Sequence, residues 1–201
     1  MNTKNWILEN LKTLFYALII AIIIRSLLIQ PFYIPSSSME PNLLVGDRLF
    51  VTKYSYGYSR HSFPFSPRIF DGRYLYNKPK RGDVIVFKTP SDNRTDYIKR
   101  LIGLPGDEIQ IIKGELFINK KKISRTKIGD RSDIRCAGYE HEVFEFKEEL
   151  PNQEIHAAVY KKEGSMLNTD VYIVPEIDTY NAYFMQFYLM TQLQTTTLRL
   201  T

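Results

Sequence analysis

An apolar segment near the amino terminus constrains this chain most. Leu14 to Ile24 is eleven residues without a charge, and Leu11 to Ile34 contains only Lys12 and Arg25 as charged residues. A bilayer core of about 30 Å needs about 20 apolar residues to cross it. A spanning helix must therefore begin near Ile7 or Leu11, with the two cations reaching toward the interfaces.

A buried core helix and a cleaved signal peptide are the alternatives for this segment. A signal peptide is disfavoured, because the apolar run continues into Arg-Ser-Leu-Leu-Ile-Gln-Pro without a small-residue cleavage site. We expect an uncleaved membrane anchor, with its cytoplasmic stub, over residues 1–30. Lys4 and Lys12 on the short first flank favour a cytoplasmic amino terminus and export of the remainder. Membrane lipid is thus an expected partner.

Composition excludes several classes of protein. The 201 residues are 44% hydrophobic and 24% charged, which suits one folded core with an appendage. The net charge of +5 suits anionic partners, but charges of both signs are interspersed without a long basic block, so it supports a membrane-facing surface as readily as nucleic acid. The single Cys136 excludes an intrachain disulfide. His61, His141 and His156 lack ligand spacing and are expected to be surface or satisfied residues, so neither a metal nor a cofactor is predicted.

After Pro31 the chain changes to short runs rich in β-branched and aromatic residues, separated by turn-forming residues. This pattern predicts a mainly β domain over residues 31–176. Tyr54–Lys80 follows neither helical nor strand period and is predicted to be a long surface excursion. Residues 177–201 form an atypical segment without an assigned structure. A tight hairpin is expected at Lys113-Gly114. The predicted strands are Arg48–Lys53, Asp83–Lys88, Tyr97–Ile102, Glu108–Ile112, Glu115–Ile118, Ala157–Tyr160 and Val171–Val174.

Three strings occur in order behind the apolar segment. The first is Ile34-Pro-Ser-Ser-Ser-Met-Glu-Pro-Asn-Leu43, which alone would be read as a turn. The second is Gly46-Asp-Arg-Leu-Phe-Val-Thr-Lys53. The third runs from Lys80-Arg-Gly-Asp to Tyr97-Ile-Lys-Arg and Gly103-Leu-Pro-Gly-Asp107. Over about residues 1 to 120 the chain closely resembles bacterial type I signal peptidases.

The resemblance implies a membrane-anchored serine endopeptidase with an antiparallel β domain. Such an enzyme cleaves signal peptides from exported preproteins after small residues, on the outer side of the cytoplasmic membrane. Residue by residue, it implies Ser38 as nucleophile, Lys99 as general base and the Ser36 hydroxyl as an oxyanion donor. Neither a cofactor nor a nucleic-acid partner is implied, and we expect a monomer. The implied pocket for the residue before the cut consists of Ile34, Pro35, Met39, Leu43, Tyr97 and Ile98.

The chemistry of the implied pair sets a physical requirement. Lysine can accept the serine proton only when neutral, so its pKa must fall from about 10.4. Burial among apolar groups lowers the pKa of an amine. In a strand, Tyr97, Lys99 and Leu101 share one face, which predicts apolar surroundings for the lysine.

One departure from the family pattern keeps a second hypothesis open. The late Gly-Asp-Asn-Arg string of the family, with its following Ser and Asp-x-Arg, does not occur in the sequence. We therefore expect weak activity, or an inactive membrane-anchored relative that binds peptides without turnover. A soluble Ser/Lys self-cleaving repressor is a third hypothesis. The anchor and the lack of a helix-turn-helix segment before the serine argue against it.

Overall fold

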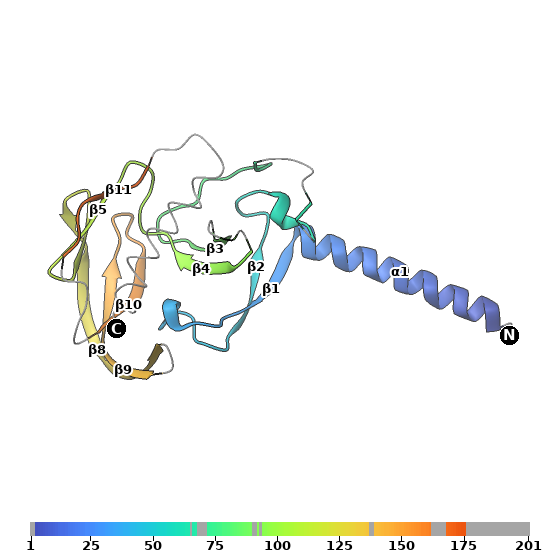
Figure 1. The fold of residues 1–201 in the computed structure, drawn as a ribbon, viewed down its shortest axis with the longest axis horizontal. Coiled ribbons are helices and arrows are strands. Elements are labelled where there is room, and N and C mark those ends of the chain that lie inside the picture. The colour runs from blue at the N-terminus through green and yellow to red at the C-terminus, as the bar shows by residue number, and fades with distance from the viewer. Residues whose placement is uncertain are drawn as a thin grey trace. The chain divides into compact units, whose positions relative to one another are not determined.

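The computed structural model describes residues 3–64, 66–67, 72–89, 92, 94–136, 139–161 and 168–175. These residues form one α-helix and eleven strands in antiparallel pairs, which confirms the mainly β fold class (Figure 1). The chain divides into one unit of Met1–Phe32 with Arg48–Lys78 and a second unit of Tyr33–Asp47 with Pro79–Thr201. The predicted segment 177–201 lies outside the described residues.

The helix α1 (Thr3–Leu27) begins earlier than the predicted start near Ile7 or Leu11. Its span Trp6–Leu27 has 22 residues and a mean hydropathy of 2.0. At 1.5 Å per residue this span is about 33 Å long, which matches a bilayer core. None of the 18-residue apolar window of this span is buried inside the protein, and only Ser26 near its end is buried, so the core-helix alternative is wrong.

The first unit continues from α1 into the paired strands β1 (Ile29–Tyr33) and β2 (Arg48–Thr52). The excursion that follows β2 folds back on itself, because Tyr58 and Tyr74 exchange two backbone hydrogen bonds of 2.9 Å. Gly57 is required there: a Cβ atom at this position would lie 2.3 Å from the Tyr74 carbonyl oxygen. The described part of the excursion contains a short 3₁₀ turn, η2 (Arg60–Ser62), in which the Ser59 hydroxyl accepts a hydrogen bond from the His61 amide.

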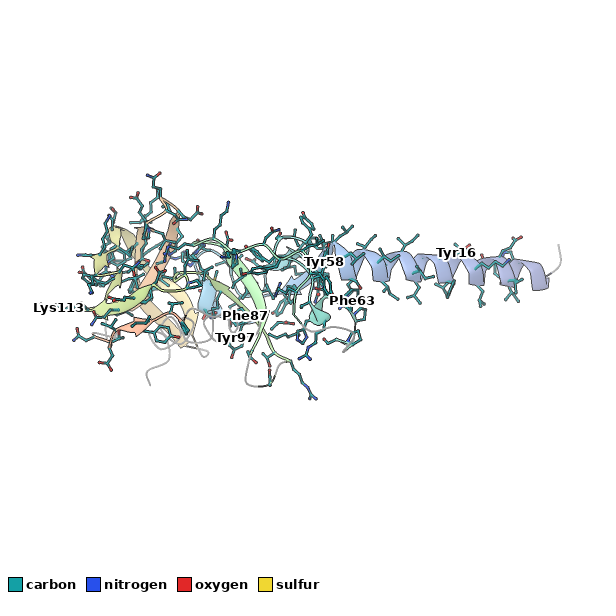
Figure 2. All side chains as sticks on the ribbon, turned by 90° about the horizontal axis from the view of Figure 1, so that it is seen from above. Tyr16, Tyr58, Phe63, Phe87, Tyr97 and Lys113 are labelled. Atoms are coloured by element: carbon teal, nitrogen blue, oxygen red, sulfur yellow. The ribbon has the colours of Figure 1, made fainter. Side chains whose placement is uncertain are left out.

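Within the second unit, two small sheets position the residues of interest. The strands β3 (Val84–Lys88) and β4 (Asp96–Arg100) form a pair, and β5 (Glu108–Ile112) pairs with β6 (Glu115–Ile118) and β11 (Tyr172–Ile173). The predicted hairpin is confirmed: Lys113 at its tip has φ 51° and Gly114 has φ 73°, both in the left-handed region that this turn requires (Figure 2). Strand β7 (Lys121–Lys122) extends the sheet beyond β6. The main apolar cluster under these strands is Ile102, Ile109, Ile118, Ile123, Leu150 and Val174.

The third sheet was largely missed by the sequence analysis. Its strands are β8 (Ser124–Cys136), β9 (Tyr139–Glu149) and β10 (Ile155–Lys161), of which only β10 overlaps a predicted strand. Charged residues break the apolar alternation of β8 and β9, so no period-two signal is visible. Cations instead pack on aromatic rings, with Lys127 Nζ 4.1 Å from the Phe144 ring centre and the Arg125 guanidinium 4.7 Å from that of Phe146. Cross-strand contacts of this kind become visible only once the strands are paired.

Candidate active site

Ser38 lies in the short 3₁₀ turn η1 (Ser37–Met39), directly after an extended residue, Ser36. The approach to this turn is fixed by Ile34, whose amide donates to the Asp47 carbonyl and whose carbonyl accepts from the Gly46 amide, both at 3.0 Å. The hydroxyls of Ser36 and Ser38 share a hydrogen bond of 3.3 Å. The structure therefore brings together two of the three side chains that the sequence singled out.

The loop after Ser38 is held from a distant part of the chain. Asn42 Nδ2 donates a hydrogen bond of 2.7 Å to the carbonyl oxygen of Ala157 on β10. The amides of Asn42 and Leu43 both donate to the Met39 carbonyl, which closes a tight turn. This arrangement restricts the movement of the 3₁₀ turn that carries Ser38.

Lys99 is buried on β4, with only 4% of its surface exposed. It pairs directly with Ile85 of β3, and the same face carries Phe87 and Leu101, all three of them buried apolar residues. Burial lowers the pKa of the Lys99 amine from 10.5 to about 8. The predicted apolar strand face is confirmed, although Tyr97 at its outer end is partly exposed and packs edge-on against Phe87.

Strand β4 and the turn η1 pack against each other, which brings Lys99 and Ser38 onto neighbouring elements. Among the residues that the structure describes, no hydrogen bond joins the Lys99 amine to the Ser38 hydroxyl. The lysine side chain is thus desolvated without a hydrogen-bonding partner inside the described part of the chain. An amine in this setting is easier to deprotonate than one on the surface.

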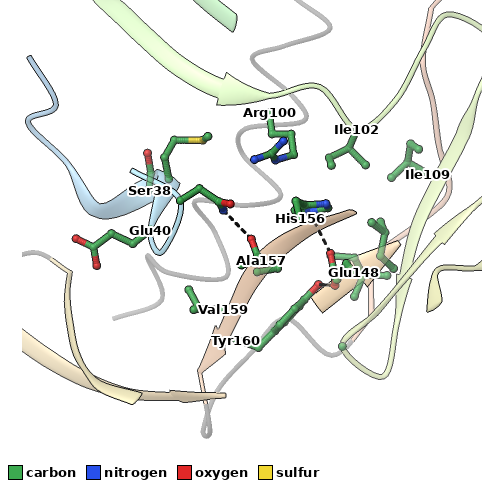
Figure 3. A pocket seen from close by; sticks show the side chains of 16 residues that line it. Ser38, Glu40, Arg100, Ile102, Ile109, Glu148, His156, Ala157, Val159 and Tyr160 are labelled. Carbon is green, nitrogen blue, oxygen red and sulfur yellow. Dashed lines mark hydrogen bonds and ion pairs between the residues drawn. The ribbon is translucent and has the colours of Figure 1, made fainter. Parts of the chain in front are cut away.

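A cavity of about 100 Å³ opens beside Ser38 (Figure 3). It is bordered by Arg100, which lies on the opposite face of β4 from Lys99. Of the residues predicted to form the substrate pocket, only Met39 lines it. Ile34 is buried, Leu43 and Ile98 are half-buried, and Pro35 and Tyr97 are more exposed. The other lining residues are Glu40, Asn42, Ile102, Ile109, Ile111, Gly114, Leu116, Glu148, His156, Ala157, Ala158, Val159 and Tyr160.

The cavity also contains a buried polar group that sequence reasoning missed. Tyr160 donates a hydrogen bond to Glu148, whose Oε2 atom lies 3.5 Å from His156 Nε2. Burial raises the pKa of Glu148, while burial and then the charge of Arg100 lower the pKa of His156 to about 4. The prediction that His156 is a surface or satisfied residue is wrong, because it is buried and, among the residues that the structure describes, neither ring nitrogen makes a hydrogen bond. No local pattern marks these residues, since the pairing of β9 with β10 brings them together.

The features described so far are those of a membrane-anchored serine peptidase. They are an apolar anchor helix, a β domain, and a serine on a short turn that packs against a strand with a buried lysine. Comparison with known proteins extends this assignment. The family described as "Signal peptidase, peptidase S26" matches residues 7–175. The chain belongs to this family, signal peptidase I, whose members are serine endopeptidases that cleave signal peptides.

Curated relatives carry the same description, "Signal peptidase I". The protein from Rickettsia conorii (strain ATCC VR-613 / Malish 7) is 42% identical over 187 residues, which cover 87% of this chain and 68% of the relative. That from Rickettsia canadensis (strain McKiel) is 41% identical over 186 residues, with the same coverage of both chains. That from Rickettsia akari (strain Hartford) is 43% identical over 173 residues, 80% of this chain and 62% of the relative.

Proposed function

We propose that Ser38 is the nucleophile and Lys99 the general base of this peptidase. The observation that carries the proposal is the buried Lys99 amine, whose pKa falls to about 8 on a strand packed against the serine turn. Neutral Lys99 takes the Ser38 proton while the serine oxygen attacks the carbonyl carbon of the residue before the cut. The resulting ammonium then donates a proton to the departing amine, and an acyl group remains on Ser38. Water activated by the same amine releases that acyl group.

Ser36 is proposed to stabilise the negative oxygen of the tetrahedral intermediate. Its hydroxyl lies 3.3 Å from the Ser38 hydroxyl, within reach of an oxygen bound to the carbon under attack. The second donor in this proposal is the backbone amide of Ser38. A single oxyanion donor is typically worth about 10²–10³ in turnover, so we assign the Ser36 hydroxyl a supporting role.

The substrates are proposed to be signal peptides of exported preproteins with a small residue before the cut. Ile34, Pro35, Met39, Leu43, Tyr97 and Ile98 remain the proposed lining of the shallow cup for that residue. We propose that one copy of the chain acts alone. Ser36, Ser38 and Lys99 all lie in the second unit of the same chain, which supports this view.

Cleavage is expected to rise with pH through an apparent pKa of about 8. Only the neutral form of Lys99 accepts the serine proton, and burial moves its pKa down from 10.5. The rate should therefore fall about tenfold per unit below pH 7 and level off above pH 9. The measurement is kcat/KM for a preprotein in detergent between pH 6 and pH 11. A rate that still climbs steeply near pH 10 would show that the base is not desolvated.

We propose that the amino terminus faces the cytoplasm and that residues after about Gln30 lie on the outer side of the membrane. The short first flank with Lys4 and Lys12 supports this orientation. In a Cys136→Ser background, Ile128→Cys places a thiol at an exposed position of β8. An impermeant thiol reagent should label it in spheroplasts with intact inner membranes, and Lys4→Cys in the same background only after lysis. The reverse labelling order would invert the proposed topology.

Peptide binding without turnover is the second candidate function. It is favoured by one observation: among the described residues, nothing orients the Lys99 amine through a hydrogen bond. A serine-directed acylating probe separates the two candidates, because only an activated hydroxyl reacts. Labelling that is lost in Ser38→Ala supports the peptidase. An unlabelled chain that still binds a signal peptide supports the second candidate.

A further inference from the structure

Strand β10 has an edge that no other described strand covers. It lies at the end of its sheet, in the order β10-β9-β8. The hairpin before it closes with a hydrogen bond of 2.9 Å from the Leu150 amide to the Glu154 carbonyl. Because hydrogen-bonded and non-hydrogen-bonded pairs alternate along antiparallel strands, Ala157 and Val159 fall in non-hydrogen-bonded pairs with β9. Their backbone N–H and C=O groups therefore point away from β9, toward the free edge.

This free edge offers hydrogen-bonding groups to an incoming strand. The Ala157 carbonyl already accepts the hydrogen bond of 2.7 Å from the Asn42 side chain. Among the residues that the structure describes, the Ala157 amide and both backbone groups of Val159 make no hydrogen bond. A strand edge of this kind can bind an extended peptide, which pairs with it as a further strand.

The free edge borders the cavity that opens beside Ser38 (Figure 3). Ala157 and Val159 line this cavity from β10. An apolar cavity of about 150 Å³ holds benzene, so a cavity of about 100 Å³ has room for one aliphatic side chain. The apolar wall of the cavity consists of Ile102, Ile109, Ile111 and Leu116.

His156 is an independent sign that the cavity takes a ligand with polar groups. The residue lines the cavity and is only 6% exposed. Within the described part of the chain, neither of its ring nitrogens makes a hydrogen bond. A buried polar group without a partner is unfavourable. A peptide backbone carries both a donor and an acceptor, which are the two partners that a neutral imidazole needs.

The surroundings of Ser38 indicate which part of a peptide the cavity receives. Of the residues proposed to hold the residue before the cut, only Met39 also borders the cavity. The cup and the cavity are therefore two different sites next to the serine. A bound substrate extends from Ser38 in both directions, and the cup takes the residue before the cut. The cavity is then left for residues after the cut.

We propose that the residues of the preprotein that follow the cut bind as an added strand along the edge of β10. Their backbone pairs with the Ala157 amide and with both backbone groups of Val159, and one aliphatic side chain enters the cavity toward His156. This inference rests on the proposed function, because it takes Ser38 as the residue that makes the cut.

The test is an N-methyl scan of substrate peptides with the full chain in detergent. The parent peptide has about six residues after the cut, and each variant carries one N-methyl group in that part, which removes one N–H donor. In an added strand only alternate amides face the neighbouring strand. The value of kcat/KM should therefore fall about tenfold at every second position and little at the positions between. Binding of the same peptides to Ser38→Ala, measured by fluorescence anisotropy, should show the same alternation.

Val159→Pro tests the protein side of this pairing. Proline removes the Val159 N–H, which points to the free edge, so the pairing of β10 with β9 should persist. This variant should bind and cleave the parent peptide about tenfold less well, and its loss should not add to that of the N-methyl group at the paired position. The matched control is Ile155→Pro, whose lost N–H also points to the free edge but does not border the cavity. It should behave like the parent chain.

Three outcomes would overturn the proposal. N-methyl effects that are absent, or that do not alternate, would show that the residues after the cut form no added strand. Equal losses in Val159→Pro and Ile155→Pro would exclude a specific contact at Val159. Losses from Val159→Pro and from every N-methyl group that add in full would place the two changes at separate sites. If Val159→Pro does not fold, the scan with the parent chain still decides.

Failure of this inference and failure of the dyad remain distinguishable. A chain that cleaves the peptides without any alternation would contradict the added strand and keep the dyad. A chain that does not cleave would contradict the dyad, and the anisotropy measurements with Ser38→Ala would still show whether binding alternates.

Discussion

Lys99→Met is expected to lower preprotein cleavage by about 10⁴-fold or more. Loss of a general base that acts as a unit with its nucleophile removes most of the catalytic effect of the pair. Methionine keeps an unbranched chain of similar length next to Ile85 and Phe87, so the strand pair β3–β4 should remain folded. The measurement is single-turnover cleavage of a preprotein in detergent. Lys121→Met, at an exposed position of β7, is the matched control and should cleave at the parent rate.

The same substitution is expected to stabilise the protein at neutral pH. The amine is held in an apolar environment that lowers its pKa from 10.5 to about 8, so below pH 8 the folded state carries a charge that the unfolded state accommodates better. Lys99→Met should raise the free energy of unfolding by about 1–3 kcal/mol at pH 7. The gain should shrink as pH rises from 8 to 10.5, because the wild-type amine is then neutral when folded. Thermal unfolding at pH 7 and pH 10 measures this difference.

Two serine variants complete this test. Ser38→Ala should match Lys99→Met in lost activity, whereas Ser36→Ala should retain more, with a loss of about 10²–10³-fold. Cleavage by Lys99→Met at the parent rate would show that the dyad is assigned wrongly. Full activity of Ser36→Ala would show that the Ser36 hydroxyl is not an oxyanion donor. It would leave the assignment of Ser38 and Lys99 unchanged.

Asp107→Ala is expected to destabilise the second unit by about 3–5 kcal/mol. The Asp107 carboxylate is buried and accepts hydrogen bonds from Arg81 Nη2 at 2.7 Å and from Asn119 Nδ2 at 2.8 Å. It also accepts from the Leu104 amide. Removing the carboxylate leaves the largely buried Arg81 guanidinium without its counter-charge. The turn that follows the Lys99 strand would then lose its main anchor.

Denaturant unfolding of the full chain in detergent measures this effect. Lys120→Ala, which breaks an exposed ion pair with Glu108, is the control and should change stability by about 0–1 kcal/mol. If Asp107→Ala does not fold, Asp107→Asn still tests the charge, because the amide oxygen can accept hydrogen bonds without balancing Arg81. A change below about 1 kcal/mol in both Asp107 variants would contradict a structural role for this carboxylate.

Local periodicity allowed part of the fold to be predicted from the sequence. The uncharged run from Leu14 to Ile24 predicted the anchor helix, and Lys113-Gly114 predicted the hairpin between β5 and β6. Alternation along Tyr97, Lys99 and Leu101 predicted the apolar face that lowers the pKa of the lysine. These features depend on neighbours within a few residues, because a helix repeats every 3.6 residues and a strand every two.

Tertiary pairing decided the rest. The pairing of β9 with β10 placed Glu148 beside His156, and the Asn42 side chain reached Ala157, 115 residues further along the chain. The cavity beside Ser38 is built from such contacts, and of its lining residues only Ser38 and Met39 were predicted from the sequence as site residues. A hydrogen bond or packing contact between distant segments needs only suitable side chains at two positions, and many pairings of one sequence satisfy that condition. Only the folded register, fixed by burying the common apolar core, selects which pair meets.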